Sequence, residues 1–220
     1  MRNLNFKPMT PKTKSLFHII LFFLVVNSAF SQIDLGSIHN FTLFTGNGAL
    51  DNTAYSQIKG DIGTNAGLIS GFPSGSVLFG NEHNANAITA QAVIDLEAAV
   101  AQIKAMPGTT TVAHDPCYGN FVGGETFYPG VYKKGGAVTI CGDIILDAQG
   151  DPNALFIFNF EGKLDTYANA SVVLIGCASP ANVFFLSGGA ISLATNTIMV
   201  GNLISSPAGA VSGAAGANLI

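Results

Sequence analysis

The sequence predicts a mainly β protein that folds as an irregular β-helix, or β-solenoid, with one long α-helix alongside. Three short runs resemble one another, at 60–63 (GDIG), 142–145 (GDII) and 201–204 (GNLI). One long helical segment separates the first two runs. The other strand-like runs are too brief for a sandwich, and internal repetition of this kind is typical of stacked rungs. A stack of rungs has flat faces, which suit binding better than catalysis.

The first 31 residues read as a secretory signal peptide. Four basic residues precede an apolar stretch at 16–26, and Ala29-Phe30-Ser31 forms a small-x-small cleavage site before Gln32. The apolar stretch is short for a membrane span, so we expect cleavage, with a membrane anchor as the alternative. We therefore expect a secreted protein, extracellular or on the outer cell surface, with a single domain over 32–220.

The composition excludes some classes of partner. The leader holds four of the nine Lys and Arg residues and none of the thirteen Asp and Glu residues, which leaves five basic against thirteen acidic. Nucleic acid requires a basic face, so we do not expect it as a partner. No stretch after the leader is long and apolar enough to cross a bilayer, so we expect no membrane partner after cleavage. Beyond the leader there is no Arg and no Trp, and small or hydroxylated residues must cover the surface.

The chain up to residue 80 reads as short strands separated by glycine turns. We expect strands at 41–45, 57–64 and 76–79, because β-branched and aromatic residues in these runs are bounded by Gly, Asn and Pro.

A helix is expected over about 84–106, a stretch without Gly or Pro. Asn84 or Asn86 is expected to cap its start, and Pro107-Gly108 to end it. One apolar stripe runs along the helix at 3.6-residue spacing, and it consists of Ile88, Ala92, Leu96, Ala99, Val100 and Ile103. A stripe this long needs a long flat partner, so we expect the helix to lie along one side of the strand stack.

After an irregular segment at 109–125, the second half returns to strands. We expect them at 127–132, 137–141, 143–147, 154–160, 171–175, 182–186, 198–200 and 202–204. The final Asn218-Leu219-Ile220 repeats 202–204 and reads as the opening of another rung. Because a terminal rung of a solenoid needs a cap, we expect the full protein to continue beyond residue 220.

No residue cluster predicts catalysis or metal binding. His39, His83 and His114 are far apart in the sequence, and no C-x-x-C pair is present. Some β-helix enzymes use carboxylates, and four acidic residues are close in the sequence, at Asp143, Asp147, Asp151 and Asp165. A lyase commonly adds a basic residue, which a domain without Arg supplies poorly. We therefore expect no enzyme activity, no cofactor and no metal.

Three cysteines follow the leader: Cys117, Cys141 and Cys177. Export permits a disulfide, and three cysteines allow one bridge with one thiol left over. We favour Cys117 with Cys141, because the first lies in the irregular segment and the second ends a predicted strand. The other pairings stay open.

Several motifs in a fixed order carry a resemblance to a known family. They are the segments 35–43, 58–63, 69–73, 128–132, 173–185 and, most specific, 146–158 (LDAQGDPNALFIF). With them the chain resembles the bacterial and fungal ice-binding, or antifreeze, proteins with a discontinuous β-solenoid. The resemblance implies a β-helix of triangular cross-section, the long helix along one side, and one flat face that binds ice.

The ice-binding motif of that family is Thr-Ala/Gly-x-Thr/Asn, and the chain matches it in part. Thr53-Ala54-Tyr55-Ser56 differs at the last residue, Thr45-Gly46-Asn47-Gly48 fits the first half, and Thr166-Tyr167-Ala168-Asn169 keeps the two ends. With further hydroxyl residues in the repeated runs, the candidate ice-binding residues are Thr45, Asn47, Thr53, Ala54, Ser56, Thr64, Thr166, Asn169, Thr195 and Ser205.

Columns of hydroxyl and methyl groups on a flat strand face can anchor ordered water. Residues i and i+2 lie about 6.7 Å apart on one face and rungs about 4.7 Å apart, and a hydroxyl both donates and accepts. We therefore expect a monomer that adsorbs to ice through a flat Thr/Ser/Ala-rich β-face and inhibits ice growth and recrystallisation. An adhesion or carbohydrate-binding solenoid is the alternative, which the missing Trp disfavours; a β-helix hydrolase ranks last.

Overall fold

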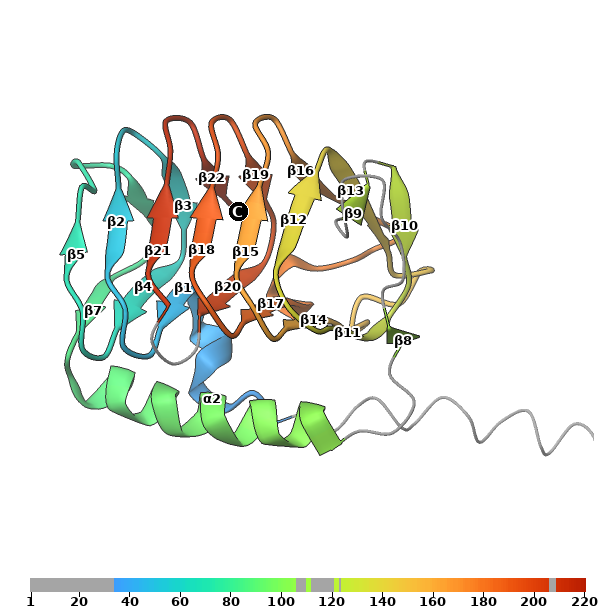
Figure 1. The fold of residues 1–220 in the computed structure, drawn as a ribbon, viewed down its shortest axis with the longest axis horizontal. Coiled ribbons are helices and arrows are strands. Elements are labelled where there is room, and N and C mark those ends of the chain that lie inside the picture. Colours follow the sequence, from blue (N-terminus) through green and yellow to red (C-terminus); the bar gives the residue numbers. More distant parts are fainter. Residues whose placement is uncertain (1–33, 106–109, 112–120, 123, 206–208) are drawn as a thin grey trace, which may run out of the picture. The chain divides into compact units, whose positions relative to one another are not determined.

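The computed structural model describes residues 34–105, 110–111, 121–122, 124–205 and 209–220, and the fold below concerns these residues. Residues 33–220 form one compact unit. Its strands lie in three parallel sheets. Apart from the two strands on either side of the long helix, consecutive strands along the chain belong to different sheets, so the chain winds as a three-sided β-helix (Figure 1). The expected mainly β solenoid is confirmed. The expected leader at 1–31 lies outside the described residues and stays a prediction.

Sheet A has eight strands, in the spatial order β7 (Glu82–Asn84), β4 (Asp61–Thr64), β1 (Phe41–Thr45), β20 (Asn202–Ser205), β17 (Val183–Ser187), β14 (Phe156–Phe160), β11 (Gly130–Lys134) and β8 (Thr110–Thr111). Sheet B has seven, in the order β5 (Ile69–Ser70), β2 (Leu50–Asn52), β21 (Val211–Gly213), β18 (Ile191–Leu193), β15 (Leu164–Thr166), β12 (Val138–Cys141) and β9 (Phe121–Val122). Sheet C also has seven, in the order β10 (Glu125–Phe127), β13 (Asp143–Asp147), β16 (Ser171–Ile175), β19 (Ile198–Met199), β22 (Asn218–Leu219), β3 (Gln57–Lys59) and β6 (Val77–Leu78).

The rungs do not stack in chain order. The first rung, β1–β3, pairs with the last, β20–β22, in all three sheets: Leu43 lies opposite Leu203 in sheet A, for example, and Asp51 opposite Ser212 in sheet B. We call this boundary the seam. Because β22 lies between β19 and β3, the last rung has a neighbour on each side. This corrects the expectation that residues 218–220 open an uncapped rung.

The three repeated glycine runs mark corners of the β-helix. Their first residues have left-handed backbone angles, with φ of 120° at Gly60, 103° at Gly142 and 117° at Gly201, a conformation that glycine adopts without steric cost. The segment 57–64, expected as one strand, is therefore split at Gly60 into β3 and β4. Gly60 and Gly201 turn from sheet C to sheet A, whereas Gly142 turns from sheet B to sheet C, so the runs are not all equivalent.

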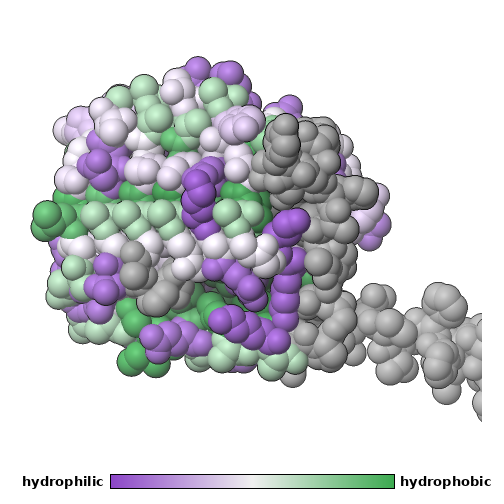
Figure 2. Space-filling model, in the orientation of Figure 1, coloured by the Kyte–Doolittle hydropathy of each residue, from purple (hydrophilic) through white to green (hydrophobic). Residues whose placement is uncertain are grey.

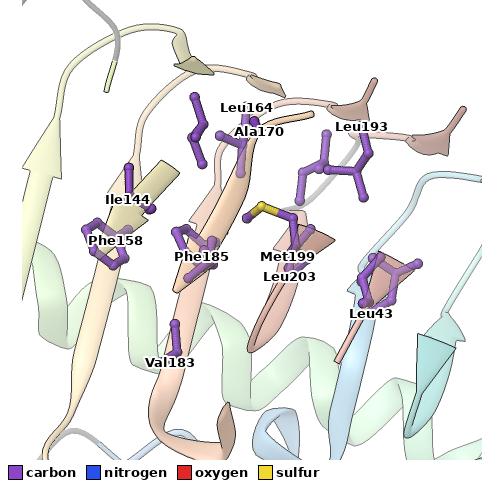
Figure 3. Close-up of a cluster of buried hydrophobic side chains, with 14 of the residues drawn as sticks. Leu43, Ile144, Phe158, Leu164, Ala170, Val183, Phe185, Leu193, Met199 and Leu203 are labelled. Carbon is purple, nitrogen blue, oxygen red and sulfur yellow. The ribbon is translucent and has the colours of Figure 1, made fainter. Parts of the chain in front are cut away.

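Apolar columns fill the interior in register (Figure 3). The rings of Phe158 and Phe185 stack with centroids 4.9 Å apart and planes 9° apart. The same inward column of sheet A continues across the seam, through Leu203 and Leu43 to Ile62. Aligned apolar neighbours on successive strands are the main stabilisation of such a stack.

The helix α2 (Ala87–Ala105) covers the outer face of sheet A (Figure 1). It begins after Asn86, whose Oδ1 accepts hydrogen bonds from the backbone N–H groups of Ile88 and Thr89 at 3.0 and 3.1 Å, which makes Asn86 the N-cap. The expected end at Pro107-Gly108 lies outside the described residues. Four expected stripe residues are buried and Val100 is half-buried, but Ile88 is 48% exposed, so its place in the stripe is wrong. Thr89 is buried instead.

The buried helix residues pack on outward side chains of sheet A. This second core contains Phe44, Ile157, Phe184, Leu186 and Ile204 together with Ala92, Leu96, Ala99 and Ile103. Sheet A is therefore apolar on both faces, which explains the continuous apolar runs in β14 and β17. Two short 3₁₀ turns complete the described elements: η1 (Gly36–Asn40), which contacts α2, and η2 (Pro180–Asn182).

A carboxylate ties η1 to the helix. The Asp95 Oδ2 atom accepts hydrogen bonds from the Ser37 hydroxyl at 2.6 Å and the Ser37 backbone N–H at 2.7 Å, and Gln91 donates to Oδ1. These hydrogen bonds, that of the Ser37 side chain first, lower the pKa of Asp95. A side chain on Gly36 would collide with this carboxylate, since an added Cβ would lie 2.5 Å from it.

Buried hydroxyls stabilise the corner between sheets A and B. Thr45 Oγ1 donates to the Gly209 carbonyl at 2.7 Å and accepts from the Gly48 N–H at 3.0 Å. Thr64 repeats the pattern one rung along, on the carbonyl of Gly48 and the N–H of Gly67. On the other side of the seam, Ser187 repeats it with the carbonyl of Gly162 and the N–H of Gly189. The hydroxyl of Ser205 lies within donating distance of the carbonyls of Gly189 and Gly209, at 2.7 and 2.8 Å. We call these four residues the corner ladder.

Replacing Thr45 by Val should test the corner ladder. The substitution keeps the shape of the side chain but leaves a buried carbonyl and a buried N–H without this partner, so we expect a loss of about 1–3 kcal/mol in the free energy of unfolding. Chemical denaturation measures it. Thr195→Val, at an exposed turn, is the matched control, with an expected change within about 0.5 kcal/mol. Equal losses would contradict a structural role for the ladder.

Truncating Leu96 should test how the helix covers sheet A. Leu96 is 1% exposed in the second core, and Leu96→Ala should lower the free energy of unfolding by about 2–5 kcal/mol. Ile94→Ala, at a residue 60% exposed on the same helix, should cost well under half as much. Comparable thermal and denaturant midpoints for the two variants would argue against helix packing of this kind.

Candidate functional site

Two of the three sheets have outer faces that no described element covers. Sheet C carries aliphatic side chains there, and those of Val173, Ile175, Ile198 and Ile220 are 39–44% exposed. Sheet B is different, because its three adjacent strands β18, β21 and β2 present mostly small outward side chains. This sheet faces the viewer in Figure 1.

Strict alternation along the strands creates this array. In β18 the side chains of Ile191 and Leu193 point inward and are at most 4% exposed, so Ala190, Ser192 and Ala194 point outward. The strands β21 and β2 repeat the pattern. We call the outward residues of these three strands and their flanks the small-residue face, which comprises Ala190, Ser192, Ala194, Ala210, Ser212, Ala214, Ala49, Asp51 and Thr53.

The rows of the face are held in register by backbone pairing. Ser192 lies opposite Ser212, which lies opposite Asp51. In the row before them, the carbonyl of Ala210 accepts from Ile191 at 2.9 Å and that of Ala49 accepts from Val211 at 2.8 Å. Neighbouring side chains in a row are therefore about 4.7 Å apart, and successive rows about 6.7 Å apart. Figure 2 shows these rows as level bands of pale atoms across the molecule.

The face crosses the seam. Its strand β2 comes from the first rung and its strands β18 and β21 from the last two, so residues about 140–160 positions apart in the chain share one plane. The exposed carboxylate of Asp51 accepts a 2.9 Å hydrogen bond from the Ser70 hydroxyl on the neighbouring strand β5. The array therefore depends on tertiary structure and does not exist in any local segment.

Larger side chains border the face on both sides. On β15 the outward residues are Lys163, Asp165 and Tyr167, and the first two form an ion pair. On β5 the flanking residues are Leu68, which is 72% exposed, and the half-buried Phe72. The flat part is thus three strands wide.

Half of the expected site residues are buried, which corrects their assignment to an exposed face. Thr45, Thr64 and Ser205 are 0% exposed in the corner ladder. Thr166 is 5% exposed, with its Oγ1 2.8 Å from that of Thr197, and Ser56 donates to Asn52 at 2.9 Å. The physical reason is that a corner buries polar groups, which short hydroxyl side chains satisfy: backbone groups for Thr45, Thr64, Thr166 and Ser205, and the Asn52 amide oxygen for Ser56.

The other five expected residues are accessible, but only one lies on the small-residue face. Thr53 is exposed there and donates to the Gly213 carbonyl at 3.0 Å. Asn47 lies in the turn between β1 and β2, Ala54 in the turn after β2, and Asn169 and Thr195 in the turns that follow β15 and β18. Asn169 has φ of 63°, which an Asn side chain tolerates.

Eight residues of the small-residue face were missed, although a local signal for them exists. The segments 190–194 (AISLA) and 210–214 (AVSGA) both alternate small outward residues with inward ones. Of the expected residues, only Thr195 lies beside these segments, in the turn after 190–194. The alternation alone does not tell which sheet face is open, because α2 covers one of the three.

The described residues contain no group of three or more His, Cys, Asp or Glu side chains that could hold a metal ion. The Nε2 atom of His83, on β7, lies 2.7 Å from the Oδ2 atom of Asp61, on the neighbouring strand β4, and the His83 ring packs edge to face with that of Phe41. These contacts fix the terminal strand of sheet A to the stack.

Cys117 lies outside the described residues, so its pairing with Cys141 stays a prediction. Cys177 is a free, exposed thiol. No helix among the described residues is long and apolar enough to cross a membrane.

Comparison with known proteins identifies relatives over most of the chain. Residues 44–219 match the family model described as Ice-binding-like. An ice-binding protein of Nostoc sp. (strain HG1) is 32% identical over 171 residues, which are 77% of this chain and 61% of that protein. An ice-binding protein of Flammulina populicola is 26% identical over 216 residues, covering 87% and 84% of the two chains.

Solved structures show the same fold. The ice-binding protein from an Antarctic bacterium of the Flavobacteriaceae superposes with a TM-score of 0.69 at 32% identity, over 84% of this chain and 47% of that one. One from an Antarctic biological consortium has a TM-score of 0.68 at 29% identity, over 84% and 89%. The chain thus spans 61% of the Nostoc relative and about half of the Flavobacteriaceae protein.

Proposed function

The chain belongs to the Ice-binding-like family, and from this premise we propose that it binds ice through the small-residue face of sheet B. The observation that carries the proposal is the in-register array of Ala, Ser and Thr side chains, with Asp51 as its one charged member, on a sheet face that no described element covers. The similar proteins are named for ice binding in bacteria and fungi alike.

The physical basis is many weak contacts aligned on one rigid plane. The hydroxyls of Ser192 and Ser212 can both donate to and accept from water, whereas that of Thr53, which donates to the Gly213 carbonyl, can accept from water. Backbone pairing on both sides of each strand keeps these groups from moving independently. Little conformational entropy is then lost on adsorption, so weak contacts can add up.

On this basis the protein acts at a surface and is not an enzyme. Adsorption to ice would inhibit both growth and recrystallisation of the crystals. A secreted monomer fits this role, because ice forms outside the cell and one face suffices for adsorption. Secretion rests on the sequence of the first 31 residues.

Replacing Ser212 by Lys should abolish most of the ice activity. Ser212 is the central residue of the face, and a long ammonium side chain there would hold the plane away from the ice. We expect thermal hysteresis and recrystallisation inhibition to fall about tenfold or more, because the remaining small side chains can no longer reach the ice surface together. Ice-affinity partition of the purified, folded variant gives an independent readout.

The matched control is Val173→Lys, which places the same charge on the outer face of sheet C. It should keep the activity of the unmodified protein. Full activity in the Ser212→Lys variant, or equal losses in both variants, would contradict sheet B as the ice-binding site. Absence of all ice activity in the unmodified, folded protein would contradict the proposed function.

Export should remove the leader. When the full sequence is expressed in a bacterial host with a general secretion system, we expect the exported protein to begin at Gln32 because the small-x-small site ends at Ser31. Intact mass and N-terminal sequencing of the exported fraction measure this. Replacing Ala29 by a bulky charged residue should block cleavage, and retention of residues 1–31 in the unmodified protein would favour the membrane anchor.

A further inference from the structure

One strand of sheet B departs from its neighbours. The segments 190–194 and 210–214 place Ala, Ser and Ala outward on β18 and β21, whereas the segment 163–167 (KLDTY) places Lys163, Asp165 and Tyr167 outward on β15. The backbone register does not change here, since Leu164 pairs with Ile191 and Asp165 with Ser192. On the outer face, the difference therefore lies in the side chains and not in the backbone.

These three side chains form a raised line across the sheet, which we call the β15 ridge. Tyr167 is 57% exposed, and the side chain of Lys163 is 58% exposed beside that of Asp165, at 23%. Figure 2 shows strongly hydrophilic atoms interrupting the pale rows over β15. The pattern of small residues resumes beyond it on β12, where Ala137 and Thr139 flank the inward Val138.

We propose that the β15 ridge limits the ice contact of this protein to the three strands β18, β21 and β2. The inference rests on the proposed function of the small-residue face. A planar crystal surface cannot touch strands on both sides of a ridge that is one lysine or tyrosine side chain high. The hydrated ion pair also binds its own water, which does not fit an ice lattice.

The ridge has little part in the stability of the fold. An exposed ion pair contributes little to the free energy of unfolding, and the inward residues of β15, Leu164 and Thr166, supply its packing and its buried hydrogen bonds. Tyr167 is tied to the neighbouring rung by its backbone, because its N–H donates a 2.9 Å hydrogen bond to the carbonyl of Ile140. The outward positions of β15 can therefore be changed without disturbing the rungs.

The decisive variant converts β15 into a copy of its neighbours, with Lys163→Ala, Asp165→Ser and Tyr167→Ala combined. The flat face then extends over β12 and β15, from three strands to five, about 4.7 Å for each added strand. We expect thermal hysteresis at equal protein concentration to rise about twofold, with the circular dichroism spectrum unchanged. The reverse variant, with Ala190→Lys, Ser192→Asp and Ala194→Tyr on β18, should narrow the face and lower the activity.

A matched control removes one positive and one negative charge from sheet C, with Lys59→Ala and Asp143→Ser. It should leave the activity unchanged. Unchanged or lower activity in the β15 variant, or an equal rise in the control, would overturn the inference.

The Ser212→Lys variant separates this result from a failure of the proposed function. If Ser212→Lys loses activity while the β15 variant gains none, the small-residue face binds ice but the β15 ridge does not limit the contact. If Ser212→Lys keeps full activity, the small-residue face is not the ice-binding site, and the inference about the ridge fails with it.

Discussion

The pairing of the first rung with the last rung is the constraint on which the rest of the structure depends. Three strands of each rung meet at the seam, and the same inward column runs through Phe185, Leu203, Leu43 and Ile62 without a break. Without this contact, the edges of β1–β3 and β20–β22 would both expose unpaired backbone groups and apolar residues. The corner ladder crosses the same boundary, since the Thr45 hydroxyl donates to the carbonyl of Gly209, and Thr64 extends the ladder to the second rung through the carbonyl of Gly48. The small-residue face lies over the seam, so the binding surface forms only when the ends of the chain have met.

Much of the fold could be predicted from local signals. The strands at 41–45, 143–147 and 171–175 were found with correct bounds, because each is a short apolar run between turn residues, and the helix was found within three residues of its observed start. Several strands of sheet B were not found, since strands of two or three residues such as β2 and β5 carry too few residues for a pattern. The order of the rungs could not be read from the sequence either. Pairing across the seam depends on which apolar columns align in space, and neighbouring rungs offer similar columns.

The site was harder to predict than the fold because the same residue types serve two purposes. A Thr or Ser at the end of a strand can point outward to water or inward to a corner carbonyl, and one position along the strand decides which. Thr53 and Thr45 illustrate the difference: both donate to a backbone carbonyl of the next rung, but the first is exposed and the second completely buried. The family motif is defined by hydroxyl residues, whereas the face consists as much of alanine, a residue with no functional group that would mark a site. Inward burial of Ile191, Leu193 and Val211 is what identifies their outward neighbours.

The helix explains why the rungs do not stack in chain order, and why the outer face of sheet B remains uncovered. Eight strands of sheet A span about 33 Å at the usual spacing between strands, and a helix of nineteen residues spans about 28 Å. Such a helix carries the chain from β7 at one end of the stack back toward β8 at the other. The later rungs then fill the space toward the first rung, and the seam follows. Because the helix returns along sheet A, where the outward residues are Phe, Ile and Leu, it covers the face that could not remain in water. The small outward residues of sheet B offer a helix too little apolar area to bury, so that face stays open and flat, which is the condition for contact with an extended rigid surface.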